Sequence, residues 1–495
     1  MAASDLNVAD IVAAGGATAD QLATGTGVAA STLVGSAAAQ VNARTMSGGI
    51  ANGLVTPPSD FAWNFTRYPI NVYRRGPFDY ATDLDPQSLM PSGFWNSPVY
   101  YVDTAKADDS LSGTTPATAK ATIRGAITAA IAAGASGVII MVKKGLYDRS
   151  RDLTKSTIGS GTLPEIPVAL IGYGGRVDHG PVALLTWAAD ATYTSCYTSA
   201  RSNVARVLDT SRQDDEGNYV ELPAIADATT LNSAATEEGW LQNGANVLVK
   251  RKDGKAPSNT NTYVLLINSP SLQFGTQAAF ISGISGIGGV TGTLQASDVS
   301  NTPIVAVDSS FAFSGTTVST SATRAIYIDN KDAIAAFFRC KAGRVPTDAF
   351  NFHMASYLNA GVQPLHVLTV GCRGIYSGVT VNNNNQNSCN GWTLHENVRG
   401  IDLNGRYLTA RGGSIADIDQ TQAWLLGTIS GDDLGDASFP SHAVRAGDTA
   451  RIWAQELRVT GAITALHAAS GTDPRIFARS CQDGGGLRLG NVTSY

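Results

Sequence analysis

Short apolar runs, separated by polar stretches rich in Gly and Asn, recur along most of the chain from Pro98 onward. The runs are too short for helices and are rich in β-branched and aromatic residues, a pattern typical of strands. After Phe274 they return at intervals of roughly 20 residues, the spacing expected for the coils of a solenoid. They are residues 304–307, 325–328, 335–339, 366–370, 400–403, 422–426, 450–453, 457–459 and 486–489.

This pattern predicts an all-β fold, and two architectures fit it. A β-sandwich and a parallel β-helix both consist of many short strands joined by turns. Length favours the second, because roughly 300 residues of short strands would need several separate sandwiches. We therefore predict a parallel β-helix, with a sandwich as the alternative.

One helix is predicted at the start of the regular region. Residues 122–133 carry apolar side chains at helical spacing, and Gly134 is placed to end the helix. Strands are expected on either side, at residues 98–103 and 138–142. A helix there would cover the open end of the first coil, which needs protection because its strands have no further partner.

Other segments depart from this rhythm. Residues 1–56 are Ala, Gly, Thr and Ser with almost no aromatic residues, so this arm cannot bury enough apolar surface to fold alone and needs a partner. Residues 57–97 form a neck rich in Pro and aromatic residues. Residues 200–275 are typical of a small inserted antiparallel β subdomain, with Asn243-Gly244 and Asp253-Gly254 as turns. The remaining segments are the start of the β-helix with its capping helix, residues 98–199, and the later coils with the C-terminal region, residues 276–495.

The composition of the chain limits the classes of binding partner that can be expected. The chain has 495 residues, 52 of them Gly, and only 15% are charged, which suits closely stacked strands. A net charge of −5 with scattered Lys and Arg excludes nucleic acid and anionic membranes as expected partners. The start of the chain lacks the basic region of a signal peptide, and residues 125–142, though uncharged, are better explained by a helix, a turn and a buried strand than by a membrane span.

The five cysteines are odd in number, form no CxxC pair and lack zinc-ligand spacing with histidine. Free buried thiols, made in a reducing cytoplasm, are therefore expected. No metal site and no cofactor is predicted.

Several motifs, among them Val99–Asp103, Ala121–Ile123 and Gly145–Tyr147, resemble those of right-handed parallel β-helix proteins of the pectate-lyase-like and phage-tailspike type. The order of strand, Asp/Gly loop, Thr-Ile helix and Gly-x-Tyr strand is similar to the first coil of that family, and later motifs extend the resemblance over most of residues 98–430. The motifs are Val99–Asp103, Asp108-Asp109, Leu111–Gly113, Ala121–Ile123, Gly145–Tyr147, Asn203–Asp209, Gly239-Trp240, Asp253–Pro257, Thr347–His353, Asn390–Glu396, Gly405–Tyr407, Gly412-Gly413, Ile415–Asp419 and Trp424–Gly427. The family often has Asp-Gly-Phe before the histidine of the Thr347–His353 motif; here Ala349 replaces the Gly.

The resemblance implies a right-handed β-helix whose N-terminal arm anchors it to a virion. The expected role is a tailspike-like spike or tail fibre, made in the host cytoplasm, that attaches the particle to host surface polysaccharide and could degrade it. Residues 1–56 would bind a virion adaptor, baseplate or portal-side protein, and a homotrimer is implied. The alternatives are an active depolymerase (glycoside hydrolase or lyase) as the main role, and a secreted bacterial polysaccharide lyase.

Candidate chemistry is densest between residues 348 and 419. Hydrolysis of a glycosidic bond needs two carboxyl groups, and elimination from a uronic acid needs a base such as histidine. The catalytic candidates are Asp348, His353, His395, Glu396, Asp417 and Asp419, and the substrate-binding candidates are Arg399, Arg406, Trp392 and Trp424. Because coils of a β-helix stack roughly 4.8 Å apart, such distant positions can converge. Asp417 and Asp419, at alternating positions of a strand, should share one face, where they are either solvated or bonded to turn amides. Each candidate also has a structural explanation, at a coil corner or in the core.

Overall fold

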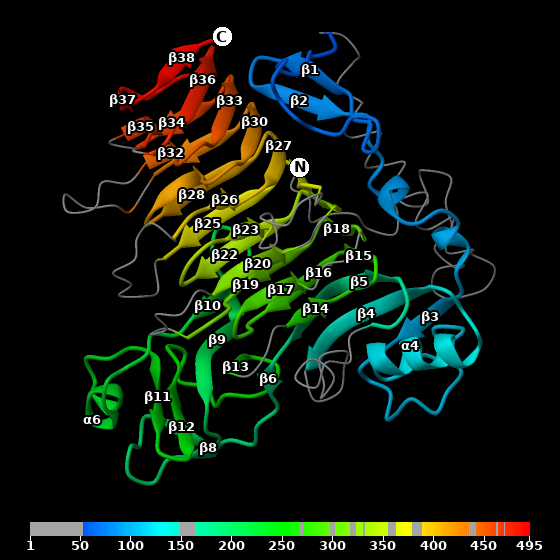
Figure 1. The fold of residues 1–495 in the computed structure, drawn as a ribbon. Helices are drawn as coiled ribbons and strands as arrows, with labels where there is room; N and C mark the ends of the chain where they lie inside the picture. The colour runs from blue at the N-terminus through cyan, green and yellow to red at the C-terminus, as the bar shows by residue number, and fades with distance from the viewer. Residues whose placement is uncertain are drawn as a thin grey trace.

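Parallel strand pairing dominates the computed structural model of the chain and produces a β-helix (Figure 1). Each full coil gives one strand to each of three parallel sheets, in the order sheet 1, sheet 2, sheet 3. The predicted all-β parallel β-helix is confirmed, and the sandwich alternative is wrong, because every strand pair after residue 275 in the described residues is parallel. The structure describes residues 53–148, 164–267, 271–297, 302–316, 323–329, 332–354, 363–378, 389–432, 434, 442–461, 464–469 and 471–495.

The three sheets are continuous along the helix. Sheet 1 consists of β14 (Leu272–Phe274), β17 (Gly292–Ser297), β20 (Arg324–Asp329), β23 (Phe350–His353), β26 (Trp392–Leu394), β29 (Gly413–Asp417), β32 (His442–Ala446), β35 (Thr464–Ala468) and β37 (Leu487–Leu489). Sheet 2 consists of β15 (Ala279–Ser282), β18 (Ile304–Val307), β21 (Ile334–Phe338), β24 (Leu365–Val370), β27 (Val398–Leu403), β30 (Gln422–Leu426), β33 (Arg451–Gln455), β36 (Arg475–Arg479) and β38 (Val492–Ser494). Sheet 3 consists of β16 (Ile284–Ile287), β19 (Ser310–Ala312), β22 (Lys341–Val345), β25 (Arg373–Ser377), β28 (Arg406–Ala410), β31 (Ile429–Gly431) and β34 (Arg458–Thr460). All nine predicted runs fall on these strands.

One residue in a left-handed conformation turns the chain from sheet 2 to sheet 3 in each coil. These corner residues have φ between 48° and 66° and are Gly283, Asp308, Arg339, Gly371, Asn404, Gly427, Glu456 and Ser480. For residues with a Cβ this conformation is unfavourable by roughly 1–2 kcal/mol, so the stacking of the coils must enforce it. Successive corners lie farther apart than the predicted spacing of roughly 20 residues, because each coil holds three strands and the loops between them.

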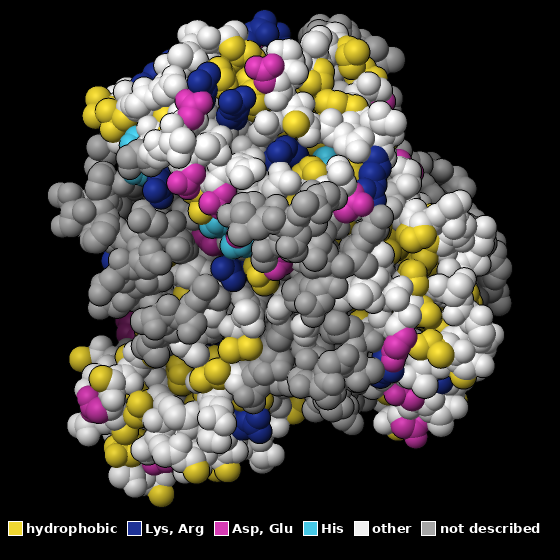
Figure 2. Space-filling view, viewed as in Figure 1, with side chains coloured by type: hydrophobic (Ala, Val, Ile, Leu, Met, Phe, Trp, Pro, Cys, Tyr) yellow, Lys and Arg dark blue, Asp and Glu magenta, His cyan; other side chains and the backbone are white. Residues whose placement is uncertain are grey.

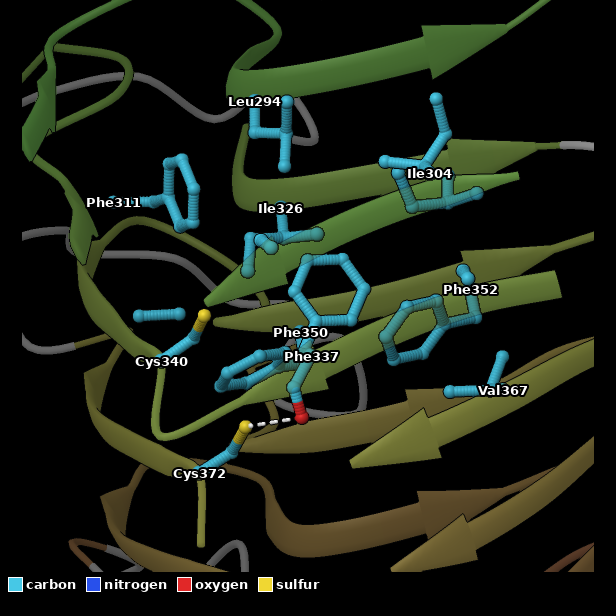
Figure 3. Close-up of a cluster of buried hydrophobic side chains, with 14 of the residues drawn as sticks. Leu294, Ile304, Phe311, Ile326, Phe337, Cys340, Phe350, Phe352, Val367 and Cys372 are labelled. Carbon is cyan, nitrogen blue, oxygen red and sulfur yellow. Dashed lines mark hydrogen bonds between the residues drawn. The ribbon is translucent and has the colours of Figure 1, made fainter. Parts of the chain in front are cut away.

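Side chains of equal position stack inside the helix from coil to coil (Figure 3). In sheet 1, Ile326 pairs with Leu294 on one side and with Phe350 on the other. The Phe337 ring from sheet 2 packs against Phe350 and Phe352, with ring centroids 5.9 and 5.7 Å apart. Burying each such ring contributes about 2–3 kcal/mol, so the interior column supplies much of the stability of each coil.

The first coil begins with β3 (Val99–Val102) and the long strands β4 (Val138–Asp148) and β5 (Val168–Gly180), of which β5 pairs with both β15 and β16. Between β3 and β4 lies α4 (Ile123–Ala132), as predicted. Thr122 caps it by accepting a hydrogen bond from the Gly125 amide. Its apolar face packs on the interior side chains of this coil, so α4 covers the open end of the β-helix.

Two antiparallel sheets lie between β5 and β14. One contains β6 (Val182–Ala183), β9 (Val204–Gln213), β10 (Tyr219–Glu221) and β13 (Thr262–Leu266); the other contains β7 (Ala188–Ala189), β8 (Tyr197–Ala200), β11 (Gly239–Asn243) and β12 (Asn246–Lys250), with α6 (Ala228–Asn232) beside it. The hairpin β11–β12 turns at Gly244, where φ is 61°. We call residues 182–266 the insert.

The neck covers the outer face of sheet 2. It contains the hairpin β1 (Val72–Gly76) and β2 (Asp79–Thr82) and two short 3-10 helices, η1 (Pro86–Leu89) and η2 (Phe94–Asn96). Phe61 packs on Trp424, and the amide group of corner residue Asn404 makes hydrogen bonds of 3.0 and 2.6 Å to the backbone of Tyr80. The neck thus lies along several coils of sheet 2 and covers its apolar outer side chains.

All five cysteines are free thiols, as predicted, and four of them are buried. Cys340 and Cys372 follow corner residues and point into the interior (Figure 3).

Asp417 has an unusual environment for a carboxyl group. It pairs with Leu394 and Ala446 at a fully buried position of sheet 1. Neither carboxyl oxygen has a hydrogen-bond partner among the described residues, and burial raises the pKa of Asp417 well above its ordinary range. The expectation that Asp417 and Asp419 share a face is wrong, because β29 ends at Asp417 and Asp419 adopts a left-handed conformation with φ of 63°.

Replacing Asp417 by Asn should stabilise the fold at neutral pH. Because its pKa is higher in the folded chain than in the unfolded chain, the native state loses stability as pH rises above about 4, and Asn removes this loss. We expect a gain of about 1–3 kcal/mol at pH 7 that shrinks toward pH 4, measured by denaturant unfolding. Asp402→Asn is the comparison: burial raises the pKa of Asp402 too, but its carboxyl group accepts hydrogen bonds from Thr369, Thr428, Tyr407 and Gly405, so the loss of acceptors should make its amide variant less stable. An Asp417→Asn chain that is no more stable than the wild type at pH 7 would contradict this account.

Candidate functional site

Polar side chains from four consecutive coils meet on the outer surface of sheet 1, and we call this group the histidine face. Its members are Arg324, Tyr327, Asp329, His353, His395, Glu396 and Asp419. In the face viewed in Figure 2, histidine side chains lie beside acidic and basic ones near the middle of the molecule. The register of the sheet creates the group: Asp329 pairs with His353, and the His395 amide bonds to Phe352, so residues distant in sequence become neighbours.

The two imidazoles at the centre stack on each other. The rings of His353 and His395 lie 4.1 Å apart and 14° from parallel. The Thr393 hydroxyl donates to the Ala416 carbonyl at 2.6 Å, so His395 Nε2 must donate to Thr393 Oγ1, 3.3 Å away. Burial lowers the pKa of His395 well below 6.5, and the nearby charges of His353 and Arg324 add to the effect. His395 is therefore neutral at physiological pH.

Glu396 orients the other imidazole. Its Oε1 lies 3.1 Å from His353 Nδ1, and its Oε2 accepts a hydrogen bond of 2.8 Å from the Met354 amide. Burial opposes the charge of Glu396, but these hydrogen bonds outweigh it and lower its pKa. An ionised Glu396 accepts a hydrogen bond from His353 Nδ1–H, so Nε2 is the nitrogen that carries the lone pair in the neutral form of this imidazole. That nitrogen is buried and has no partner among the described residues.

The acidic residues of this face also cap the backbone from coil to coil. The Glu396 amide donates to Asp419 Oδ2 at 2.9 Å, and the Asp419 amide lies 3.4 Å from Asp448 Oδ2. All three acids have positive φ, between 53° and 63°, at the turn that follows sheet 1. Burial raises the pKa of Asp419, whereas that of Glu396 is lowered. Of the two alternatives left open for Asp419, solvation or a hydrogen bond to a turn amide, the structure shows the hydrogen bond.

Three members of the histidine face were not anticipated from the sequence. The Arg324 guanidinium lies 4.5 Å from the centre of the Tyr327 ring, and this ring meets His353 edge-on at 5.5 Å. The Tyr327 hydroxyl lies 3.4 Å from Asp329 Oδ2, and burial, with the Asp329 charge, raises the pKa of Tyr327 to about 12. An alignment of the strand runs coil by coil would have placed Asp329 beside His353.

The structure separates the other candidates from this face. Trp392 and Asp417 are fully buried inside the helix. Asp348 is buried at a corner, where it accepts hydrogen bonds from the Asn351 side chain and from the backbone and side chain of Asn390.

The three remaining candidates lie on other sheets. Trp424 is covered by the neck, on sheet 2. Arg399, also on sheet 2, donates to the carbonyls of Val398 and Gln420, and burial lowers its pKa to about 10. Arg406 is exposed on sheet 3. A hollow of about 270 Å³ lies between the neck and sheet 2, also away from the histidine face.

Other chemistry is limited in the described ranges. They contain no group of three or more His, Cys, Asp or Glu side chains placed to hold a metal ion. None of their helices has the length and hydropathy of a membrane-crossing helix.

The protonation of His395 can be measured directly. We expect imidazole ¹⁵N–¹H spectra of the intact chain to show His395 neutral through pH 6.5. His353→Ala should move the pKa of His395 upward, because it removes a neighbouring charge and admits water. Lys252→Ala, on the exposed surface of the insert, is the control and should change nothing. An ordinary titration of His395 near pH 6.5 in the wild type would refute the assigned environment.

No protein-family model matches the chain, and no curated protein matches it. Among solved structures, the complex structure of XylC with xylose covers 77% of this chain and 70% of its own, with 10% identity and a TM-score of 0.38. A glycoside hydrolase covers 80% and 96%, with 6% identity and a TM-score of 0.41. The Pseudomonas phage phi297 tailspike gp61 covers 72% and 65%, with 12% identity and a TM-score of 0.25. These similarities are low, and the parallel β-helix that the sequence predicted is confirmed by the strand pairing of this chain itself.

Proposed function

We propose that the chain is a virion spike that attaches the particle to host surface polysaccharide through the histidine face. The observation that carries the proposal is the group itself: an aromatic ring, two imidazoles, a guanidinium and three carboxyl groups gathered on one regular surface. Sugar rings present apolar faces that stack on aromatic rings, and hydroxyls that pair with such polar groups.

A polymer fits this surface better than a small ligand. The members of the histidine face come from coils that follow one another along the helix, roughly 4.8 Å apart. The face is therefore extended along the helix axis, and part of it reaches the surface: the side chains of His353 and Glu396 are 15% and 18% exposed. Successive sugars of a chain could contact successive coils.

The virion role draws on the sequence. Residues 1–56 are proposed to bind an adaptor, baseplate or portal-side protein, and the chain is proposed to form a homotrimer, as the resemblance to tailspikes implies. The composition of residues 1–56, which is poor in large apolar side chains, supports a segment that needs a partner to fold. Synthesis in the host cytoplasm is supported by the buried free thiols.

Attachment can be tested with purified chain and immobilised capsular polysaccharide and lipopolysaccharide from bacterial hosts of related phages. We expect binding to at least one preparation, and Tyr327→Ala should weaken it about fivefold, because a stacking surface is lost. Lys252→Ala serves as the matched surface control. Binding that Tyr327→Ala and His353→Ala leave unchanged would remove the histidine face as the contact surface.

A second candidate function is cleavage of the bound polysaccharide. It is favoured by His353, whose Nδ1 is bonded to Glu396 and whose Nε2 is unpaired among the described residues, an arrangement suited to a general base. The pKa values of Glu396 and Asp419 are also shifted in opposite directions, as expected for a pair of carboxyl groups that divide the roles of base and acid. The first feature suits elimination and the second suits hydrolysis.

Product analysis separates these chemistries. If the chain cleaves by elimination, the products absorb as unsaturated uronates and His353→Gln lowers the rate at least about 100-fold. If it hydrolyses, reducing ends appear without that absorbance, and Asp419→Asn has the larger effect. A chain that binds the polysaccharide without releasing either product is an attachment protein only.

A further inference from the structure

A row of basic side chains runs along the outer face of sheet 3, and we call it the arginine row. Lys341, Arg373 and Arg406 pair in register on β22, β25 and β28. The same position continues through Ile429 to Arg458. Neighbouring strands lie roughly 4.8 Å apart, so these cations are stacked along the helix axis.

A turn of the insert contacts the first two basic side chains of the arginine row. Glu216, in the turn between β9 and β10, lies over the first two members of the row. Its Oε2 lies 3.0 Å from Arg373, and its carbonyl oxygen accepts a hydrogen bond of 2.6 Å from Lys341 Nζ. Asp214 in the same turn pairs with Arg344, the last residue but one of β22, at 2.7 Å. Carboxylates therefore already occupy this end of sheet 3.

The far end of the row has no such anion. Arg406 and Arg458 are both exposed. Neither forms an ion pair within the described part of the chain, although the Arg458 guanidinium lies over the Phe78 ring at 4.1 Å. Like charges in register on adjacent strands repel each other, and Glu216 offsets this only at the Arg373 end. An anion bound at Arg406 would relieve the repulsion and gain charge-assisted hydrogen bonds.

We propose that the arginine row is an anion subsite that binds the carboxylates of an acidic polysaccharide lying along the helix axis. Arg406 makes the first contact beyond the insert, with its planar guanidinium suited to a carboxylate. Arg373, whose side chain is 44% exposed, is shared between Glu216 and the ligand. This inference rests on the proposed function only in that the ligand is a polysaccharide, because the row lies on sheet 3 and the histidine face on sheet 1.

The test uses the full chain with polygalacturonate, which has a carboxylate on each sugar, and with neutral dextran as the matched polymer. We expect binding to polygalacturonate and not to dextran, with affinity that falls as salt rises, because surface charges are screened. Arg406→Ala should weaken binding about three- to tenfold, and Arg406→Glu should abolish it. Arg406→Lys should lie between wild type and Ala, because it keeps the charge but loses the planar pair of donors. Lys255→Ala, an exposed residue of the insert, should bind as the wild type does.

Dextran sulfate separates carboxylate recognition from general attraction to polyanions. Equal binding of polygalacturonate and dextran sulfate, or Arg406 variants that bind as the wild type does, would overturn the carboxylate subsite. Retention of an acidic protein instead of the polysaccharide would also count against it. Loss of host-polysaccharide binding on Tyr327→Ala, with no effect of Arg406→Ala on any ligand, would leave the proposed function standing and reject this inference.

Discussion

In-register hydrogen bonding between parallel strands is the constraint on which the rest of the structure depends. A residue in one coil has a fixed neighbour in the next coil. Residues at equivalent positions therefore form a straight row along the helix axis. The interior line through Leu294, Ile326 and Phe350 is apolar, and the polar groups lie on outer lines of sheets 1 and 3. Both surfaces of interest, the histidine face and the arginine row, are such lines.

This regular stacking requires a strained, left-handed backbone at the corners. The side chains of these corner residues form hydrogen bonds to the backbone of other segments. At the turn after sheet 1, acids with positive φ accept hydrogen bonds from the backbone of the preceding coil, as Glu396 and Asp419 do. At the turn after sheet 2, Asn404 and Glu456 point outward and bind the backbone of the neck. Residues that look catalytic in a sequence can therefore be explained by the geometry of a corner, and His353, which caps nothing, is the more informative member of its group.

The sequence predicted the strand runs, the capping helix and the β-helix, because apolar periodicity depends on local spacing alone. It also indicated the region of the histidine face and four of its seven members, but not Arg324, Tyr327 and Asp329. Asp417 and Asp419 were expected to share a face because they alternate in the sequence, but alternation assigns faces only while a strand continues, and β29 ends at Asp417. Trp392 and Trp424 were candidates for sugar stacking, yet the interior and the neck cover them. The partnership of His353 with Asp329 depends on inter-coil register, and loops of unequal length hide that register from any local pattern.

The neck changes how the molecule should respond to force. A solenoid whose coils touch only their neighbours can be peeled apart one coil at a time. Here one continuous segment is fastened at Asp332, His366, Asn404 and Glu456, in four of five successive coils. A pull transmitted through the neck is thus distributed over several coils in shear, and no single coil carries the whole load.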